Sequence, residues 1–441
     1  MNTRTLAGQV AEARAVLSKR DLGAVARTAC FNSASTVAAA LGGVIVARTV
    51  GPAVRGEYAA VFSWFGLLLL AGELGQSATV CFYVASDPQR ARGYVATSRA
   101  MMMVTGACAL LAGLVMAPAL AHGNPQLTAA YRVAFAGSVI AFVGCSYTFS
   151  LQAASTERWN LVRVSQPALA FAFIVTLRLL RQLTLGTAIG VVLASMAFQL
   201  GYAYYWCRRC GLAPGHVELP LVSPLLKCGL AQLGASAPSA VNACLDQLVL
   251  SQLVPPEDLG RYAIAASVTA VPVPLVSAIG NVAFPRLAAR GGSPASSTQL
   301  ALTATAVAAG IASAILLPLA ASASWLIPAV FGPGYRGAVP LLWILTPGGV
   351  FLACGQVAGD LLRGLARPGL VAMAQGLSAV CTVILLVALL PVVGVMGAAV
   401  ASTIAYGMAL SLMIRGLWRP PRPGQARHRR RRGGHQEMLS T

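Results

Sequence analysis

The sequence predicts an all-α integral membrane protein with twelve transmembrane helices in two pseudo-symmetric six-helix bundles, and three observations support this prediction. Hydrophobic residues make up 57% of the 441 residues and charged residues only 10%, whereas soluble domains carry about 25% charged residues. Apolar segments long enough to cross a membrane recur along the chain, and basic residues collect on alternate loops between them. An internal repeat divides these segments into two halves.

Each predicted helix is an apolar run of about 20 residues, the length that crosses about 30 Å of hydrocarbon. The regular alternation of a β-barrel is absent from the sequence, and irregular backbone in lipid would leave its polar groups without partners. We therefore expect helices at residues 29–50, 58–84, 95–120, 129–153, 162–179, 184–207, 224–251, 259–284, 299–328, 337–362, 369–390 and 394–414.

Lysines and arginines are distributed unequally over the predicted loops. The two tails and every second loop hold 25 of the 32 basic residues. The other loops hold seven, which are Arg48, Arg55, Arg132, Arg178, Arg181, Arg261 and Arg336. Because basic loops remain in the cytoplasm, both termini are expected there, and this requires an even number of helices.

The expected organisation has five parts. Residues 1–28 form a cytoplasmic amphipathic segment, 29–207 the first six-helix bundle, 208–223 a cytoplasmic linker, 224–414 the second six-helix bundle, and 415–441 a disordered basic cytoplasmic tail. The tail is expected to contact anionic membrane lipids, at about 1 kcal/mol per basic residue, or to act only as a solvated segment that fixes the topology. We do not expect it to bind nucleic acid.

The internal repeat joins the segment VGPAVRGEYAAVFS, which begins at Val50, to VPPEDLGRYAIAAS, which begins at Val254. Six positions are identical at a constant offset of 204 residues: Val50/Val254, Pro52/Pro256, Gly56/Gly260, Tyr58/Tyr262, Ala59/Ala263 and Ser63/Ser267. Six helices per half is an even number, so both halves enter the membrane in the same direction. Such a parallel repeat predicts a substrate site between the halves.

Polar residues recur on one face of the seventh predicted helix, where they are spaced three or four residues apart. The first helix carries polar residues at matching positions of the repeat. We expect both faces to line a water-filled cavity, and hydrogen bonding between packed helices is the alternative. The expected cavity residues are Thr28, Asn32, Ser35, Gln232, Ser236, Ser239 and Asn242.

Three acids fall inside predicted helices, where a charge is costly and therefore indicates a function. Glu73 and Asp246 are candidates for coupling to a proton or sodium ion. A structural ion pair is the alternative for Glu73, and Arg48 is a candidate partner of Asp246. Asp360 precedes Arg363 by three residues, which favours a local ion pair.

Arginines on the outer side are candidates for binding a phosphate, because guanidinium donates paired hydrogen bonds to phosphate oxygens. They are Arg48, Arg55, Arg132, Arg178 and Arg261. The alternative is that each anchors the chain at the lipid headgroups. Cys207 and Cys210 have CxxC spacing but no second ligand pair, so we expect neither a metal site nor a cofactor.

Short motifs add a family resemblance. The stretch Ala47-Arg48-Thr49-Val50-Gly51-Pro52, followed by Gly56-Glu57-Tyr58, resembles the helix 1–2 junction of polysaccharide flippases in the multidrug/oligosaccharidyl-lipid/polysaccharide exporter superfamily. Leu245-Asp246-Gln247 and the run from Leu259 to Ala265 resemble that family too. Twelve helices suit its O-antigen type.

The resemblance implies a transporter in the inner membrane of a bacterium. Such a protein flips a polyprenyl-phosphate-linked oligosaccharide from the cytoplasmic to the outer leaflet by alternating access, for export of a cell-surface polysaccharide. A glycan polymerase or glycosyltransferases are its expected partners.

Two other functions remain open. A cation-coupled drug antiporter of the same superfamily would favour acids and aromatic residues over arginines in its cavity. A membrane glycosyltransferase or polysaccharide polymerase would require catalytic groups on a long outer loop. The predicted outer loops are short, so we do not expect an enzyme.

Overall fold

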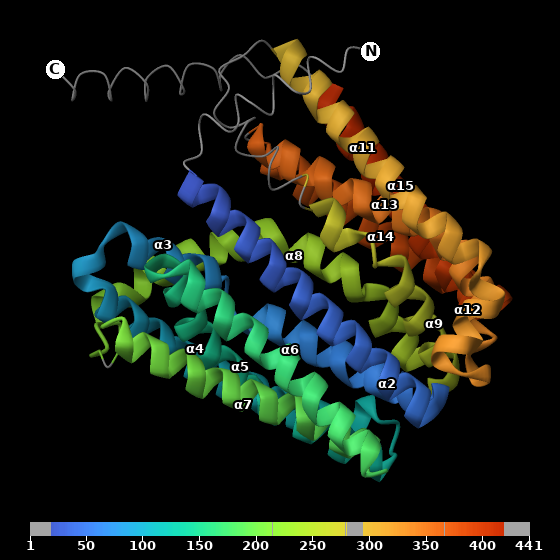
Figure 1. Ribbon diagram of the computed structural model, residues 1–441, viewed down its shortest axis with the longest axis horizontal. Coiled ribbons are helices and arrows are strands. Elements are labelled where there is room, and N and C mark those ends of the chain that lie inside the picture. Colours follow the sequence, from blue (N-terminus) through green and yellow to red (C-terminus); the bar gives the residue numbers. More distant parts are fainter. Residues whose placement is uncertain (1–18, 214, 278, 280–293, 366, 419–441) are drawn as a thin grey trace. The chain divides into compact units, whose positions relative to one another are not determined.

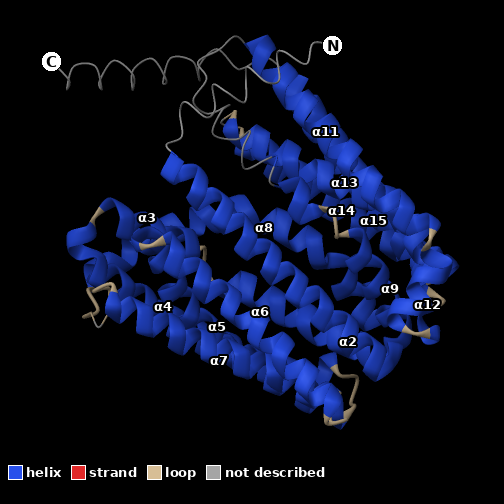
Figure 2. Cartoon of the chain, viewed as in Figure 1, coloured by secondary structure: helices blue, strands red, loops and turns tan. Residues whose placement is uncertain are grey.

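The fold is described here from a computed structural model, which covers residues 19–213, 215–277, 279, 294–365 and 367–418. These residues form helices joined by short loops (Figures 1 and 2). Ten helices in this part of the chain are long and apolar enough to cross a membrane. The protein is therefore an all-α integral membrane protein. Most of the predicted amphipathic segment and nearly all of the predicted basic tail lie outside the described residues.

The chain divides into two compact units. The first unit is Met1–Ile264 with Ser324–Val339, and the second is Ala265–Ala323 with Pro340–Thr441. The leading part of the second sequence repeat, up to Ile264, thus belongs to the same unit as the whole first repeat. The predicted division into bundles at 29–207 and 224–414 stays a prediction.

The first unit contains seven helices and parts of two more. They are α2 (Lys19–Gly72), α3 (Gln76–Ser86), α4 (Ala91–Leu120), α5 (Pro125–Ala154), α6 (Thr156–Leu179), α7 (Leu185–Arg209), α8 (Val222–Leu253), most of α9 (Pro256–Thr269) and most of α12 (Ala323–Phe331). The short 3₁₀ turns η1 (Pro88–Arg90), η2 (Leu219–Leu221) and η3 (Pro333–Tyr335) belong to it as well. Helix α2 packs against α5, α6 and α8, and α5 also packs against α4 and α7.

Helix α2 joins two predicted helices that the sequence had separated. It begins at Lys19 and continues through Gly51, whose φ of 76° and ψ of 175° are not helical. Only glycine adopts this conformation without strain, and Pro52 follows it as the first residue of the next helical stretch. The expected junction between residues 50 and 58 is therefore a sharp bend without a loop.

The second predicted helix is interrupted at Glu73, Leu74 and Gly75. Helix α2 ends at Gly72 and α3 begins at Gln76. Between them Leu74 and Gly75 have φ values of 50° and 65°. Left-handed backbone is costly for leucine, so the surrounding packing must hold this break in place.

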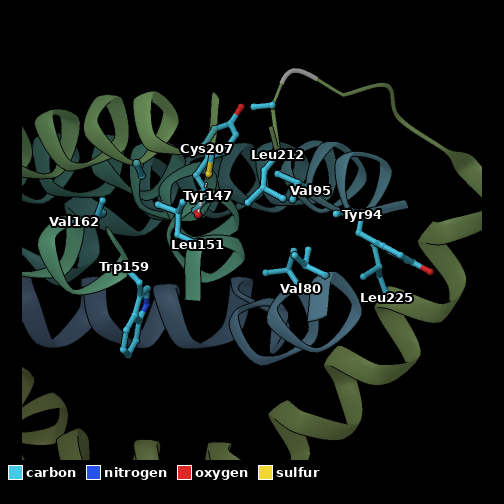
Figure 3. Close-up of a cluster of buried hydrophobic side chains, with 14 of the residues drawn as sticks. Val80, Tyr94, Val95, Tyr147, Leu151, Trp159, Val162, Cys207, Leu212 and Leu225 are labelled. Carbon is cyan, nitrogen blue, oxygen red and sulfur yellow. Dashed lines mark hydrogen bonds between the residues drawn. The ribbon is translucent and has the colours of Figure 1, made fainter. Parts of the chain in front are cut away.

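Buried apolar side chains of α3, α4, α5, α6 and α7 form a cluster in the first unit (Figure 3). It includes Val80, Tyr94, Val95, Tyr147, Leu151, Trp159, Val162, Cys207, Leu212 and Leu225, all at most 9% exposed. Cys207 donates to the Tyr147 carbonyl over 3.3 Å. A thiol behaves here as a small apolar side chain, so packing accounts for this half of the CxxC pair.

The second unit contains α11 (Pro294–Ala321), α13 (Ala338–Gly364), α14 (Pro368–Val393) and α15 (Val395–Trp418), with the end of α9. Its core combines valine, leucine and methionine side chains with alanines, including Ala301, Ala308 and Ala312 on one face of α11. Small side chains let helices approach closely in a membrane. As expected, Arg363 donates to Asp360, over 2.8 Å.

Candidate functional site

The polar face of the first helix is paired with α6. Asn160 donates through Nδ2 to the Thr28 hydroxyl over 2.8 Å, and Arg163 donates through a guanidinium nitrogen to Asn32 Oδ1 over 3.1 Å. The Arg163 guanidinium also lies 4.4 Å from the centroid of the Trp159 ring. The Ser35 hydroxyl donates to the Phe31 carbonyl of its own helix over 2.9 Å. Sequence reasoning placed Arg163 in the cytoplasmic set of basic residues and missed its contact with Asn32.

Arg163 is a half-buried cation within a candidate membrane span. None of the four ion pairs among the described residues includes it. A stacked tryptophan and an amide oxygen stabilise a guanidinium, but neither neutralises its charge. The cluster therefore retains positive charge beside the polar face of α2.

The polar stripe on α8 changes in exposure along its length. Gln232 and Ser236 are exposed, Ser239 is half-buried, and Asn242 and Asp246 are 4% and 5% exposed. The Ser239 hydroxyl is buried and makes no hydrogen bond within the described part of the chain. Gradual burial of this kind suits a helix that borders water at one end and packed protein at the other.

Asp246 lies in a hydrogen-bonded environment rather than in an ion pair with Arg48. The Tyr262 hydroxyl donates to Asp246 Oδ2, and the backbone N–H of Gln247 donates to Oδ1 over 2.7 Å. Arg48 instead donates to the carbonyls of Ala329 and Val330, over 2.8 and 3.3 Å. These carbonyls lie in the last turn of α12, where a helix attracts cations.

The remaining outer arginines differ in their surroundings. Arg261 binds Glu257 over 2.5 Å and Asp258 over 3.1 Å, so its charge is locally neutralised. The Arg55 guanidinium lies 5.2 Å from the Tyr58 ring centroid, and its buried Nε has no hydrogen-bond partner among the described residues. Arg132 and Arg178 are exposed. The five residues thus do not share one environment, and their binding of phosphate stays a prediction.

Glu73 occupies the break between α2 and α3. Its carboxylate accepts from the backbone N–H of Ser77 over 3.2 Å and from the Cys145 thiol over 3.8 Å. A carboxylate that accepts from the first turn of a helix stabilises that helix end. Capping of α3 is therefore a structural role for Glu73 beside the predicted ion coupling.

A buried polar network below the break was missed by sequence reasoning. Gln76 is fully buried, donates through Nε2 to the Leu225 carbonyl over 3.2 Å, and accepts from Ser98 over 3.2 Å. Ser98 also lies 3.1 Å from the Ser146 hydroxyl. These bonds join α3, α4 and α5 to the start of α8. A glutamine directly after Glu73-Leu74-Gly75 was the available sequence signal.

The repeat motif forms a reciprocal contact between α2 and α9. A Cβ atom added at Gly56 would lie 1.6 Å from the Pro256 carbonyl oxygen, and one added at Gly260 would lie 2.0 Å from the Pro52 carbonyl oxygen. The matched proline–glycine pairs therefore pack backbone against backbone (Figure 1 shows both helices). Only glycine permits so close an approach. Sequence similarity between the two segments thus corresponds to a shared contact.

The part of α2 next to the bend is also held by η3. The Tyr335 hydroxyl donates to the Ala47 carbonyl over 3.1 Å. Burial raises the pKa of Tyr335 to about 12, so the hydroxyl remains a neutral donor. The bend at Gly51 is therefore held by three contacts: Tyr335 of η3 with Ala47, Arg48 with α12, and Gly56 with α9.

Similar proteins have related folds. A multidrug resistance MATE family transporter of the MOP superfamily in an inward-facing conformation matches 87% of this chain and 93% of its own, with a TM-score of 0.73 and 15% identity. Lipid II flippase MurJ in an inward closed conformation matches 89% of this chain and 88% of its own, with a TM-score of 0.74 and 11% identity. A MOP superfamily transporter from Pyrococcus furiosus has a TM-score of 0.63 at 16% identity, covering 88% and 92% of the two chains.

Two characterised sequences are similar over part of the chain. Amylovoran biosynthesis protein AmsL of Erwinia amylovora is 24% identical over 45% of this chain, and teichuronic acid biosynthesis protein TuaB of Bacillus subtilis is 23% identical over 61%. The matches span 52% and 56% of these relatives' own lengths. The model of one family, described as polysaccharide biosynthesis protein, matches residues 25–290, which is more than half of the sequence. The chain therefore belongs to the polysaccharide biosynthesis protein family.

Proposed function

We propose that this protein flips a lipid-linked oligosaccharide from the cytoplasmic to the outer leaflet of a bacterial inner membrane by alternating access. Membership of the polysaccharide biosynthesis family and a fold like that of a lipid II flippase support this function. The observation that carries the proposal is the cationic polar cluster of Arg163, Asn160, Thr28 and Asn32. Of these residues, Arg163, Asn160 and Asn32 lie within candidate membrane spans. A sugar headgroup needs polar partners to cross hydrocarbon, and a phosphate needs a cation.

The same proposal includes twelve membrane passes with both termini in the cytoplasm. The 43-residue span Cys30–Gly72 contains the bend at Gly51 and is long enough to count as two passes, the second completed by α3. Helix α8 has 32 residues but is not among the ten apolar spans, because its polar stripe lowers its hydropathy. Counting both gives twelve, which agrees with the distribution of basic residues.

In this transport scheme the predicted polar residues of α2 and α8 line the passage, and the two six-helix bundles rock about it. Arg163 is added to them as a cation at the inner end. Arg55 is a candidate on the outer side, because it is half-buried and takes part in none of the ion pairs among the described residues. Contacts of the basic tail with anionic lipids, and of the protein with a polymerase or glycosyltransferases, belong to the same proposal.

A cation-coupled drug antiporter is the competing function, since a multidrug transporter has the same fold. The two functions require opposite charges at the substrate. Arg163 beside Asn32 disfavours a cationic drug and favours a phosphate. An enzymatic function requires acid or base groups on an outer loop, and the described connection between α6 and α7 has only five residues, 180–184.

Reconstituted vesicles test the proposal directly. The purified protein is placed in vesicles with a polyprenyl-pyrophosphate-linked oligosaccharide in one leaflet, and arrival in the other leaflet is read by cleavage with an added glycosidase. We expect transfer by the wild type, a loss of at least tenfold in Arg163→Ala, and partial recovery in Arg163→Lys, because lysine keeps the charge but not the paired donors. Arg208→Ala is the exposed control, because Arg208 lies in the last turn of α7 and is not among the phosphate candidates. Transport of cationic dyes without transfer of the sugar lipid contradicts the proposal.

A further inference from the structure

The first unit contains a cavity that the proposed transport does not use. Its volume is about 650 Å³, within the range of ligand sites. The bend region of α2, the start of α5 and the connection from α6 into α7 line it. Val50 on its wall lies fifteen residues beyond Ser35, which is about 22 Å along a helix. The cavity is therefore distant from the polar cluster on the inner part of α2.

The wall of this cavity is largely apolar and carries one charged group. Valine, leucine, isoleucine and alanine side chains form most of it, and its polar side chains are Glu57, Gln126 and Thr184. Glu57 is half-buried. The four ion pairs among the described residues engage Glu218, Glu257, Asp258 and Asp360, and none engages Glu57.

The sequence repeat shows that this unneutralised charge is specific to the first half. Position 57 corresponds to Arg261 at the offset of 204 residues. Arg261 receives two carboxylates from its own helix, Glu257 and Asp258. The equivalent positions before Glu57 are Ala53 and Val54, which provide no counter-ion. The two repeats thus share the backbone contact that Gly56 makes with α9. They differ at the next residue, which is the acid Glu57 in the first repeat and the base Arg261 in the second.

A carboxylate held among apolar side chains near hydrocarbon is stabilised by a cation that enters the same cavity. We infer that this cavity binds a phospholipid with an ammonium headgroup, with the Glu57 carboxylate accepting from the ammonium and the valine and leucine side chains contacting the upper acyl chain. Exposed Arg132 and Arg181 lie in the segments that line the cavity and provide cations for the lipid phosphate. The inference does not depend on what the protein transports.

Lipid titration of the purified full-length protein tests this site. The protein is stripped of lipid in detergent and titrated with phosphatidylethanolamine or phosphatidylglycerol of identical acyl chains, and thermal unfolding reports binding, because a ligand of the folded state raises the melting temperature. We expect the wild type to respond to phosphatidylethanolamine at concentrations at least tenfold lower than to phosphatidylglycerol. Glu57→Gln should raise the phosphatidylethanolamine midpoint about tenfold, because glutamine keeps an accepting oxygen but removes the negative charge that strengthens the bond to the ammonium, and should leave the phosphatidylglycerol midpoint unchanged.

Two further variants separate the charge from the space. Glu157→Gln removes an exposed carboxylate from the first turn of α6 and should behave as the wild type. Gly186→Leu fills the cavity without changing the charge, since a Cβ at Gly186 has nothing within 4 Å, and should weaken binding of both lipids. An unchanged phosphatidylethanolamine midpoint in Glu57→Gln overturns the inference, as does equal binding of the two lipids by the wild type. Protection by soluble glucosamine that depends on Glu57 also overturns it, because the occupant is then a sugar amine.

Discussion

Replacement of Gly56 by alanine tests the contact between the two sequence repeats. The added Cβ would lie 1.6 Å from the Pro256 carbonyl oxygen, whereas real Cβ atoms essentially never approach another atom within 3.0 Å. The Pro256 carbonyl is part of the backbone and cannot rotate away, so the helices must separate by more than 1 Å. Overpacking of this kind costs about 1–3 kcal/mol, and alanine recovers up to about 1 kcal/mol through its higher helix propensity. The net effect is a destabilisation of about 1–2 kcal/mol.

The assay is thermal unfolding in detergent, with surface polysaccharide of a complemented deletion strain as the functional readout. Gly66→Ala is the control, because Gly66 lies in the same helix and its Cβ would meet nothing within 4 Å. Gly260→Ala should destabilise as Gly56→Ala does. The double variant should cost less than the sum of the two, since one separation of the helices makes room for both Cβ atoms. Equal melting temperatures for Gly56→Ala and Gly66→Ala would refute the reasoning.

Substitutions at three further positions have defined outcomes. Tyr262→Phe removes the hydroxyl that donates to buried Asp246, so the protein should lose about 1–3 kcal/mol of stability. The measurement is thermal unfolding, and the control is Tyr205→Phe, because Tyr205 is exposed. Glu73→Gln keeps an oxygen that accepts from the Ser77 N–H and should leave the melting temperature almost unchanged. Glu73→Ala loses that acceptor and should lower the stability by about 0.5–2 kcal/mol. If Glu73→Gln is stable but no longer transports, Glu73 serves in ion coupling. Gln76→Leu removes a buried amide, so the Leu225 carbonyl and the Ser98 hydroxyl lose their bonds to it. The protein should lose about 1–3 kcal/mol of stability, and unaltered unfolding would exclude a structural role for the network.

Sequence patterns predicted the class of fold because the membrane imposes strong constraints on composition and length. Apolar runs and the asymmetry of basic loops follow from the cost of polar groups in hydrocarbon, so the all-helical membrane architecture could be recognised without a template. The repeat was equally informative, because Pro52 and Gly56 match Pro256 and Gly260 and then contact them. Helix interruptions were harder to predict. Gly72 and Gly75 flank Leu74, but glycine also occurs inside continuous membrane helices, so the sequence did not distinguish a continuous helix from one that is broken and held by packing.

Residues of the site were predicted less well, because pairing between helices depends on tertiary contacts. The polar positions Thr28 and Asn32 were identified from their spacing, but their partners on α6 are more than 130 residues away. Arg163 was counted with the basic residues of the cytoplasmic loops, and a count of charges does not show that its side chain contacts Asn32. Arg48 was the candidate partner of Asp246, but Asp246 accepts a hydrogen bond from the Tyr262 hydroxyl. A neutral hydroxyl gives no signal in an analysis of charges.

The break at Glu73–Gly75 and the bend at Gly51 share one physical explanation. At each place the first repeat departs from helical geometry and the second repeat packs against it with a glycine. Gly260 meets the backbone of Pro52, and Gly229 lies so close to the Leu74 carbonyl that a Cβ would meet it at 2.2 Å. An interrupted helix leaves backbone groups without intrahelical partners, and in a membrane these must be covered by protein. Helix α8 therefore covers the break after α2, and α9 covers the bend within α2. Any motion of α8 and α9 against α2 must replace these contacts with others.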